Sequence, residues 1–321
     1  MTLGDITAGF LVDVVVVNAG EVEHHQVEQF SVAAQPATTR QRSRTEGQLQ
    51  NTYLTYLRRI GHQVSGRRIT FGDTTLVVDL FDDTNRELIE VKATIDRATM
   101  RTALGQILDY ARYLEHSHRS ILLPEEPAEE MIELLHDHGV SVIWVSGVDF
   151  AVRRCPASLA ASAANDVLWQ DYSEAVVDIH LPTGAVRIIP TDDAAGHTRP
   201  PAGPLHIIAA CQPGELPGTE RERESYRRLT EYLCGRGLEP FATVGGAQDG
   251  TYQELSVAVS GLTDDHARKI GCRFGQVAVF SWNSTQWTLL ACASYRSAVH
   301  RWILAPSPPP ARELVATETP A

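Results

Sequence analysis

Residues 76–93 read LVVDLFDDTNRELIEVKA, and this stretch contains two of the strands that decide the fold. Leu76–Phe81 and Glu87–Ala93 are rich in Leu, Val and Ile, as strands usually are. The polar residues 82–85 between them, Asp-Asp-Thr-Asn, are typical of a turn. The sequence therefore predicts two neighbouring strands joined by a short connection.

The polar residues of these two strands have a pattern of their own. Successive side chains of a strand point to opposite faces, so Ile89 and Val91 are expected in the core and Glu90 and Lys92 together on the other face. Asp79 interrupts the apolar run of the neighbouring strand. A buried carboxylate without a partner is costly, so a strand that contains one usually provides a cation, a metal or an edge position.

Two carboxylates on adjacent strands form a site for a hard divalent ion, and Mg²⁺ needs only one or two of them because water and phosphate oxygens complete its shell. A lysine beside them can hold or activate the attacking water. Only two of the 28 basic residues are lysines, Lys92 and Lys269, so an ordinary positive charge in this chain is almost always an arginine. An alternative interpretation is that Glu90-Val91-Lys92 is simply part of an exposed alternating strand.

The flanking sequence predicts an α/β unit with a mixed sheet. Glu46–Ile60 places its apolar residues largely on one helical face and stops at Gly61, and Arg67–Phe71 predicts another strand. The elements expected after the quoted stretch are a helix at Thr99–Leu114, a strand at Ser120–Leu123, a helix at Pro127–His138 and a strand at Val140–Val145. The predicted order is α-β-β-β-α-β-α-β.

The chain is too long for one small core, and we expect several segments. They are a β-rich N-terminal segment at 1–37 with runs at Phe10–Asn18 and Val27–Ala33, a core domain at 38–150, a linker at 151–166, a second α/β domain at 167–304 and a disordered tail at 305–321. The linker is expected because residues 156–165 are small and rich in Ala and Ser, and the tail because it contains five Pro and no periodicity.

Composition excludes some classes of protein. The five cysteines never occur as C-x-x-C, so they predict neither a disulfide framework nor a cysteine zinc site, and a reducing cytoplasm is the expected location. The longest apolar run, Gly9–Val17, is interrupted by Asp13 and is far shorter than the roughly 18 residues of a membrane span, so no membrane association is expected.

The net charge of −12 argues against a general nucleic-acid binder. The charge is uneven, however, because residues 40–120 hold 13 basic and 10 acidic residues, whereas the rest holds 15 and 30. Only the segment around the predicted strands is therefore suited to an anionic partner.

Five more residues extend the candidate site. Glu46 stands at the start of the first predicted helix, where the helix dipole stabilises a carboxylate. Gln106 and Tyr110 are four apart and project from one face of the helix after the strands. Arg97 and Arg101 have the same spacing near the start of that helix. Each also has a simpler interpretation: a helix cap, a tyrosine at the edge of the core, and solvated charge.

Glu46, Asp79, Glu90-x-Lys92 and Gln106-x-x-x-Tyr110, in this order on an α-β-β-β-α frame, resemble the PD-(D/E)xK nucleases, the restriction-endonuclease-like group, including its subset with a Q-x-x-x-Y helix. The resemblance covers residues 40–146 and implies a restriction-endonuclease-like α-β-β-β-α-β core. The sequence departs from the motif at Val78, which stands where the family name has a proline.

The resemblance implies hydrolysis of phosphodiester bonds with Mg²⁺, for which Mn²⁺ substitutes. It implies that Asp79, Glu90 and the Val91 carbonyl bind the metal and that Lys92 orients or deprotonates water. Glu46 is then a further ligand or a supporting acid. It also implies that Gln106 and Tyr110 hold Lys92 or the DNA backbone, with Arg97 and Arg101 on phosphates.

The second domain resembles, over about residues 167–292, a small family of bacterial domains of unknown function. The sequences that carry this resemblance are HIIAACQPG at 206–214, the Gly245-Gly246 pair, interpreted as a turn, and RFGQVAVF at 273–280. This family suggests no activity. A protein, a nucleotide or a modified base is a possible partner of this domain.

The leading hypothesis is a Mg²⁺-dependent DNA endonuclease in restriction or phage defence, with a homodimer as one way to cut both strands. Two alternatives stay open. One is a non-cleaving interaction protein that keeps the nuclease-like fold as a scaffold, and the other is a nuclease regulated by a C-terminal domain that senses a small molecule.

Overall fold

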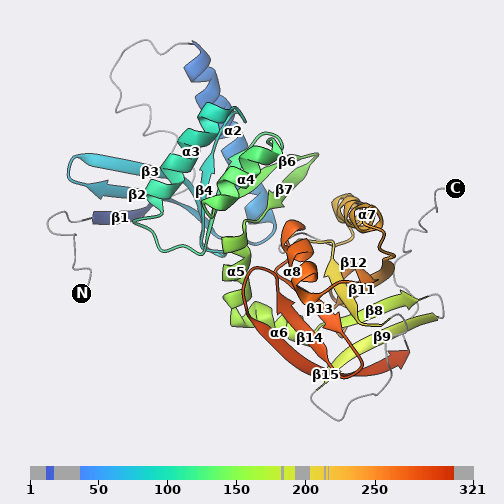
Figure 1. Ribbon diagram of the computed structural model, residues 1–321. Helices are drawn as coiled ribbons and strands as arrows, with labels where there is room; N and C mark the ends of the chain where they lie inside the picture. The colour runs from blue at the N-terminus through green and yellow to red at the C-terminus, as the bar shows by residue number, and fades with distance from the viewer. Residues whose placement is uncertain are drawn as a thin grey trace, which may run out of the picture. The chain divides into compact units, whose positions relative to one another are not determined.

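A computed structural model of the protein describes residues 12–17, 37–181, 184–191, 203–212, 215 and 217–306. The chain divides into two compact units, Met1–Ser158 and Leu159–Ala321, here unit 1 and unit 2 (Figure 1). The run predicted at Val27–Ala33 and the tail after Pro306 lie outside the described residues. The boundary at Ser158 falls inside the predicted linker.

Unit 1 contains a seven-stranded mixed sheet in the order β1-β2-β3-β4-β5-β6-β7. Its strands are β1 (Val12–Val17), β2 (Val64–Phe71), β3 (Thr74–Asp82), β4 (Glu87–Val91), β5 (His118–Leu123), β6 (Ser141–Ser146) and β7 (Asp149–Arg153). The β4–β5 and β5–β6 pairs are parallel and the other pairs are antiparallel. The elements follow the predicted order, with β1 added before it and β7 after it.

Helices cover both faces of this sheet. They are α2 (Ala37–Arg59), α3 (Arg97–Tyr110) and α4 (Glu129–Asp137). The α2 side of the core contains Leu49, Tyr53, Leu54, Leu57, Leu80, Ile89, Val91, Leu122, Ile143 and Phe150. The α3 and α4 side contains Leu88, Met100, Ala103, Ile107, Ile121, Met131, Ile132 and Leu135, among others. Burying such a side chain contributes about 1.5–3 kcal/mol.

Two predictions about this region need correction. The first helix begins at Ala37, not at Glu46, because the Arg-rich residues before Glu46 are helical although they have no apolar periodicity. It ends as predicted, since Gly61 has φ +89°, a conformation that glycine adopts readily. The second face of β4 is also covered, so every residue of this strand is buried and Glu90 does not emerge into solvent.

Unit 2 is built on a closed eight-stranded barrel in the order β10-β12-β11-β8-β9-β15-β14-β13. Its strands are β8 (Val176–Leu181), β9 (Gly184–Thr191), β10 (Leu205–Ala209), β11 (Phe241–Gly246), β12 (Gln253–Ser260), β13 (Ala278–Trp282), β14 (Trp287–Ala291) and β15 (Ser297–Pro306). Trp282, Trp287 and Trp302 are fully buried in one cluster of its core. The second domain is therefore mixed α/β, as expected, but its sheet closes into a barrel.

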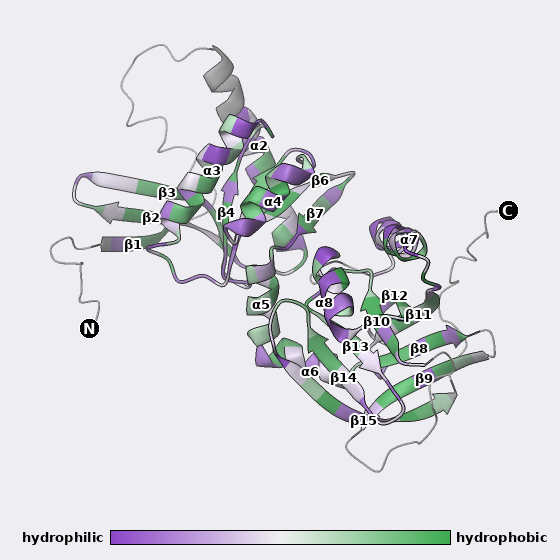
Figure 2. Ribbon diagram, in the orientation of Figure 1, coloured by the Kyte–Doolittle hydropathy of each residue, from purple (hydrophilic) through white to green (hydrophobic). Residues whose placement is uncertain are grey.

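The remaining helices are α5 (Pro156–Ala164), α6 (Asp166–Glu174), α7 (Glu220–Cys234) and α8 (Asp264–Arg273). The predicted linker is thus largely helical, because its small residues also suit a helix. Helix α7 is hydrophilic along much of its length (Figure 2), and its buried residues are Glu222, Leu229 and Leu233.

The Gly245-Gly246 pair is not a turn but the end of strand β11, where it pairs with β12 and β8. A Cβ atom at Gly246 would lie 2.1 Å from the Tyr252 carbonyl oxygen. Glycine is needed here because another part of the backbone approaches too closely for any side chain.

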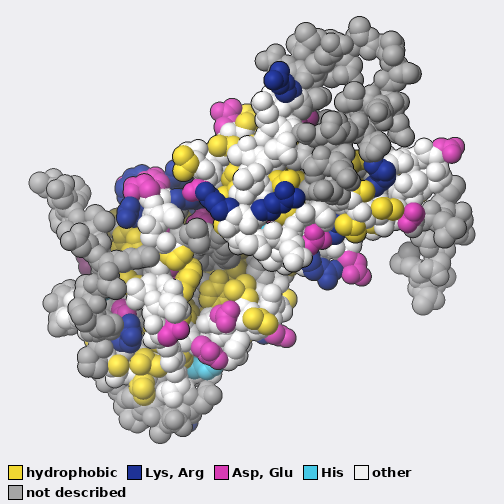
Figure 3. All heavy atoms as spheres, turned by 180° about the vertical axis from the view of Figure 1, so that it is seen from behind, with side chains coloured by type: hydrophobic (Ala, Val, Ile, Leu, Met, Phe, Trp, Pro, Cys, Tyr) yellow, Lys and Arg dark blue, Asp and Glu magenta, His cyan; other side chains and the backbone are white. Residues whose placement is uncertain are grey.

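On the face drawn in Figure 3, basic and acidic side chains are interspersed and hydrophobic ones form scattered groups. Among the described residues, no helix is both long enough and apolar enough to cross a membrane.

Candidate active site

The candidate site lies where strands β3 and β4 separate. Their ladder stops at the pair Leu80 and Ile89, whereas β4 continues beside β5, and the Lys92 N–H donates to the Leu122 carbonyl at 3.0 Å. The Asp79 carboxylate accepts the Val91 N–H at 2.8 Å. The Asp79 side chain therefore takes the place of a backbone partner from β3 at Val91. We call this point, where β3 and β4 separate beyond Leu80 and Ile89, the fork.

Asp79, Glu90 and Lys92 come together at this fork. Lys92 Nζ forms an ion pair with Glu90 Oε1. Glu90 is only 2% exposed, and its other oxygen, Oε2, is buried and receives no N–H or hydroxyl donor among the described residues, although the Asp79 and Glu90 carboxyl groups lie close enough to share a proton. A buried acceptor without a partner is unusual in a folded protein, and it is expected where a ligand belongs.

The charges of these three groups are strongly coupled. Burial raises the pKa of Glu90 well above its ordinary value, and the Asp79 carboxylate raises it further, against the effect of Lys92. Burial also raises the pKa of Asp79, although the Val91 N–H and Lys92 lower it. Burial disfavours the charged form of Lys92, but the Glu90, Asp79 and Glu46 carboxylates together outweigh this effect and raise the pKa of Lys92. The site therefore concentrates negative charge that a bound cation would relieve.

Glu46 also reaches the fork, but not from a helix end. It lies well inside α2, so the helix dipole does not explain its position, contrary to the prediction. Its Oε1 accepts the Ala93 N–H at 3.3 Å, just beyond the end of β4. The structure thus places Glu46 beside the predicted site for a different physical reason.

Helix α3 contributes two of the predicted polar residues. Its start is fixed by Asp96, whose side chain accepts the Thr99 N–H. Gln106 Nε2 contacts the Tyr110 hydroxyl at 3.4 Å, and Gln106 Oε1 is buried without a partner among the described residues. Burial raises the pKa of Tyr110, and the Glu90 and Asp79 carboxylates raise it further. Tyr110 is therefore a protonated neighbour of the acidic pair.

Arg97 and Arg101 are not part of this cluster. Arg97 pairs with Glu130 at 2.8 Å, and both arginines line an open groove of about 800 Å³ between α3 and α4. At 3.6 residues per turn, Arg97 lies about 180° around the helix from Gln106. The two arginines therefore face away from the carboxylates, and their role on phosphates stays a prediction.

The donor set fits Mg²⁺ better than a metal that needs many protein ligands. Among the described residues, no group of three His, Cys, Asp or Glu side chains is arranged to hold a metal. Asp79 and the unpartnered oxygen of Glu90 could supply two ligands, which suffices for an ion that keeps water and phosphate oxygens in its shell. The predicted role of the Val91 carbonyl stays a prediction.

Gln50 was not predicted to belong to the site. It is 7% exposed, and its Nε2 donates to the Asp79 carbonyl at 2.8 Å. The signal in the sequence was its position four residues after Glu46, which places both on one face of the helix.

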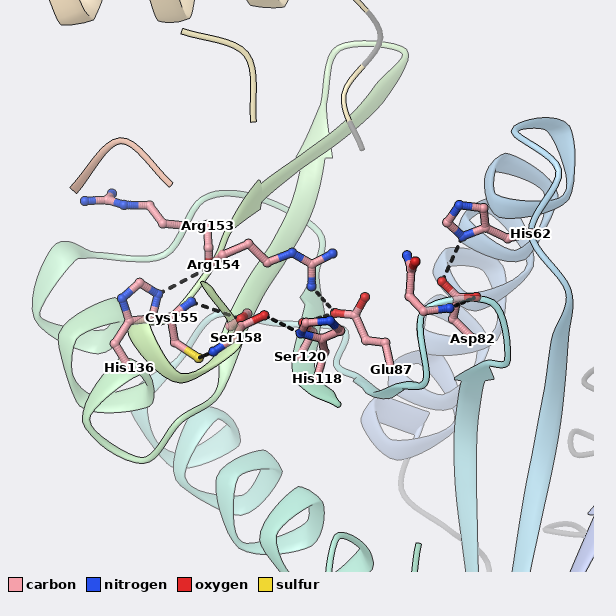
Figure 4. Close-up of polar contacts among 12 residues, drawn as sticks. His62, Asp82, Glu87, His118, Ser120, His136, Arg153, Arg154, Cys155 and Ser158 are labelled. Atoms are coloured by element: carbon pink, nitrogen blue, oxygen red, sulfur yellow. Dashed lines mark hydrogen bonds and ion pairs between the residues drawn. The ribbon is translucent and has the colours of Figure 1, made fainter. Parts of the chain in front are cut away.

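A second group of buried polar residues lies at the other end of β4 (Figure 4). Glu87 Oε1 accepts hydrogen bonds from Ser120 and Arg154. His118 Nδ1 contacts Ser158 Oγ at 2.6 Å. These contacts attach the chain after β7 to the sheet of unit 1.

Comparison with known proteins gives one match, in unit 2. The model of a family described as "Protein of unknown function (DUF3293)" matches residues 208–279. This match agrees with the predicted resemblance of the second domain to a family of unknown function. No curated protein matches the chain. No solved structure matches it.

Proposed function

We propose that unit 1 is a Mg²⁺-dependent nuclease that hydrolyses phosphodiester bonds in DNA. The observation that carries the proposal is the buried pair of carboxyl groups of Asp79 and Glu90 beside Lys92, the only lysine of unit 1. A metal bound at Asp79 and Glu90 would polarise the scissile phosphate and lower the pKa of a bound water.

The residues of the chain have separate tasks in this proposal. Asp79 and Glu90 hold the metal, and the Val91 N–H orients the Asp79 carboxylate toward the fork. Lys92 holds the attacking water and accepts its proton. The Asp79 and Glu90 charges now keep Lys92 protonated, so Lys92 can accept a proton only after a cation offsets them.

Helix α3 supports the same chemistry from another side. Tyr110 keeps its hydroxyl proton because its pKa is raised, so it can donate a hydrogen bond to a phosphate oxygen. The unpartnered Gln106 Oε1 accepts a hydrogen bond from Lys92 or from a water in the complex. Glu46 supports the metal ligands from α2.

The element order of unit 1 also supports the resemblance to PD-(D/E)xK nucleases, because the motif residues occur on α2, β3, β4 and α3 in the expected sequence. We further propose a role in restriction or phage defence. Unit 2 then provides target recognition or binds a protein or nucleotide partner, and dimerisation brings two sites together. The residues outside 40–120 hold 15 basic and 30 acidic residues, which suits a recognition that does not depend on broad charge attraction to DNA.

The test is incubation of modified and unmodified supercoiled plasmids with the full chain and Mg²⁺ or Mn²⁺, next to the Asp79→Ala variant. We expect nicked or linear products with the natural chain, and loss of these products with Asp79→Ala or with EDTA. Cleavage that Asp79→Ala leaves unchanged would contradict the proposal. No cleavage of any plasmid would favour the non-cleaving interaction protein.

A further inference from the structure

We infer that Gln50 is a positioning residue that fixes Asp79 for metal binding. The inference rests on the proposed function and adds to it a residue of α2 that the motif does not contain. Gln50 is buried, and its side-chain amide donates to the Asp79 carbonyl oxygen at 2.8 Å.

Asp79 needs such support because it lies outside both of its ladders. The β2–β3 pairing is irregular here, since its register shifts between Ser65 and Arg67, and the β3–β4 pairing begins only at Leu80. Among the described strand pairs, Asp79 is matched with no residue of β2 or β4. Its backbone therefore lies at an irregularity between two regular stretches of strand pairing.

Two hydrogen bonds that involve side chains hold Asp79 at this irregularity, one at its carboxylate and one at its backbone carbonyl. The Asp79 carboxylate accepts the Val91 N–H, and the Asp79 carbonyl accepts the Gln50 amide. Loss of the second contact would leave a part-buried carbonyl without its donor and allow the Asp79 peptide to rotate. The carboxylate would then lose its fixed direction toward Glu90.

One turn of α2 contacts both strands at the fork, β3 and β4. Glu46 contacts the Ala93 N–H at the end of β4, and Gln50, four residues later, contacts Asp79 on β3. Leu49 and Tyr53 on the same helix are buried against the sheet and keep this turn in place. The spacing of the two carboxylate-bearing strands is therefore set by α2 as well as by the sheet.

The experiment measures Mn²⁺ binding to the full chain, by calorimetry and by the EPR signal of free Mn²⁺, without nucleic acid. Gln50→Met keeps the length of the side chain and removes its donor. We expect its Kd for Mn²⁺ to rise on the order of 10-fold, the usual size for residues that orient metal ligands. Gln48→Met is the matched control because Gln48 is exposed on the same helix, and it should bind as the natural chain does.

A structural role alone would change the melting temperature and not the Kd of the folded protein. Gln50→Asn, which keeps an amide on a shorter side chain, should give an intermediate Kd and serves as the second variant if Gln50→Met does not fold. Equal Kd values for the natural chain and both variants would overturn the inference alone. No Mn²⁺ binding by the natural chain would overturn both the inference and the proposed function.

Discussion

Glu87 and Glu90 lie three residues apart on strand β4 and are almost equally buried, at 1% and 2% exposure, yet their surroundings differ. Burial raises the pKa of Glu87, but Arg154, His118 and Ser120 together outweigh burial, so the net pKa is lowered. The pKa of Glu90 is raised well above its ordinary value, because burial and Asp79 outweigh Lys92. Both glutamates pair with a cation through Oε1, but Glu90 also faces the Asp79 carboxylate, whereas Glu87 has His118 and Ser120 beside its Arg154.

The comparison teaches that burial alone does not identify a functional carboxylate. Glu87 Oε1 accepts hydrogen bonds from Ser120 and Arg154, and these bonds help to hold the chain after β7 against the sheet (Figure 4). Glu90 pairs with Lys92 on one oxygen and lies beside the Asp79 carboxylate, and its other oxygen is buried without a donor among the described residues. The neighbouring charges, and not burial, therefore distinguish a carboxylate that stabilises the fold from one that can bind a cation.

The largest expected effect is on cleavage. Glu90→Gln removes a metal-binding charge, so plasmid cleavage per folded molecule should fall on the order of 10³-fold, or about 4 kcal/mol in the activation free energy. Glu87→Gln, assayed at low temperature and corrected for its folded fraction, should keep cleavage close to the natural rate. If both variants lose cleavage alike, the distinction between the two glutamates is wrong.

The next effect is on stability. Glu87→Gln leaves Arg154 buried without its counter-charge, so the free energy of unfolding should fall by about 3 kcal/mol in urea titrations near pH 7. The control is Glu115→Gln, since Glu115 is the exposed partner of Arg86 and should change stability by less than about 0.5 kcal/mol. Equal effects of the two substitutions would show that the Glu87–Arg154 pair is not a structural clamp.

The smallest effect has the opposite sign. A carboxylate with a raised pKa in the folded protein binds more protons there than in the unfolded chain, so stability falls as pH rises through that pKa. Lys92 loses its ion-pair partner in Glu90→Gln but keeps the Asp79 and Glu46 carboxylates as counter-charges. The free energy of unfolding of Glu90→Gln should therefore be about 1 kcal/mol higher than that of the natural chain at pH 7 in EDTA.

Glu90→Gln and the natural chain should have the same free energy of unfolding below about pH 4, the ordinary pKa of a carboxyl group, because Glu90 is then protonated in both the folded and the unfolded state. For Glu87 the lowered pKa predicts the reverse: its contribution is present at neutral pH and is lost as pH falls through the folded-state value. A Glu90→Gln variant that is less stable than the natural chain at pH 7 without metal would mean that Glu90 serves the fold.

Local patterns predicted much of unit 1. The apolar runs of β3 and β4 and the turn between them gave the strands, and Gly61 gave the helix end. The start of α2 was missed because its residues before Glu46 are polar and show no helical periodicity of apolar side chains. The burial of Glu90 was missed because it depends on α3 packing across the sheet, a contact between segments distant in sequence.

The site was predicted in part. Asp79, Glu90 and Lys92 meet as expected, but Arg97 and Arg101 face another way, and the helical period alone could have revealed this. The contact of Gln50 could not be predicted because its partner is a backbone carbonyl, and a motif of side chains carries no information on backbone partners. In unit 2, barrel closure depends on the pairing of β10 with β13 and of β9 with β15, and local sequence carries no information on such distant pairs.

The most direct test of the central claim compares the natural chain with Lys92→Ala in the same Mn²⁺ titration and the same plasmid assay. Lys92 is proposed to act on water and not to bind metal, so Lys92→Ala should still bind Mn²⁺ and stay folded but lose cleavage. Cleavage by Lys92→Ala at the natural rate would contradict the account, as would a natural chain that neither binds Mn²⁺ nor cuts DNA.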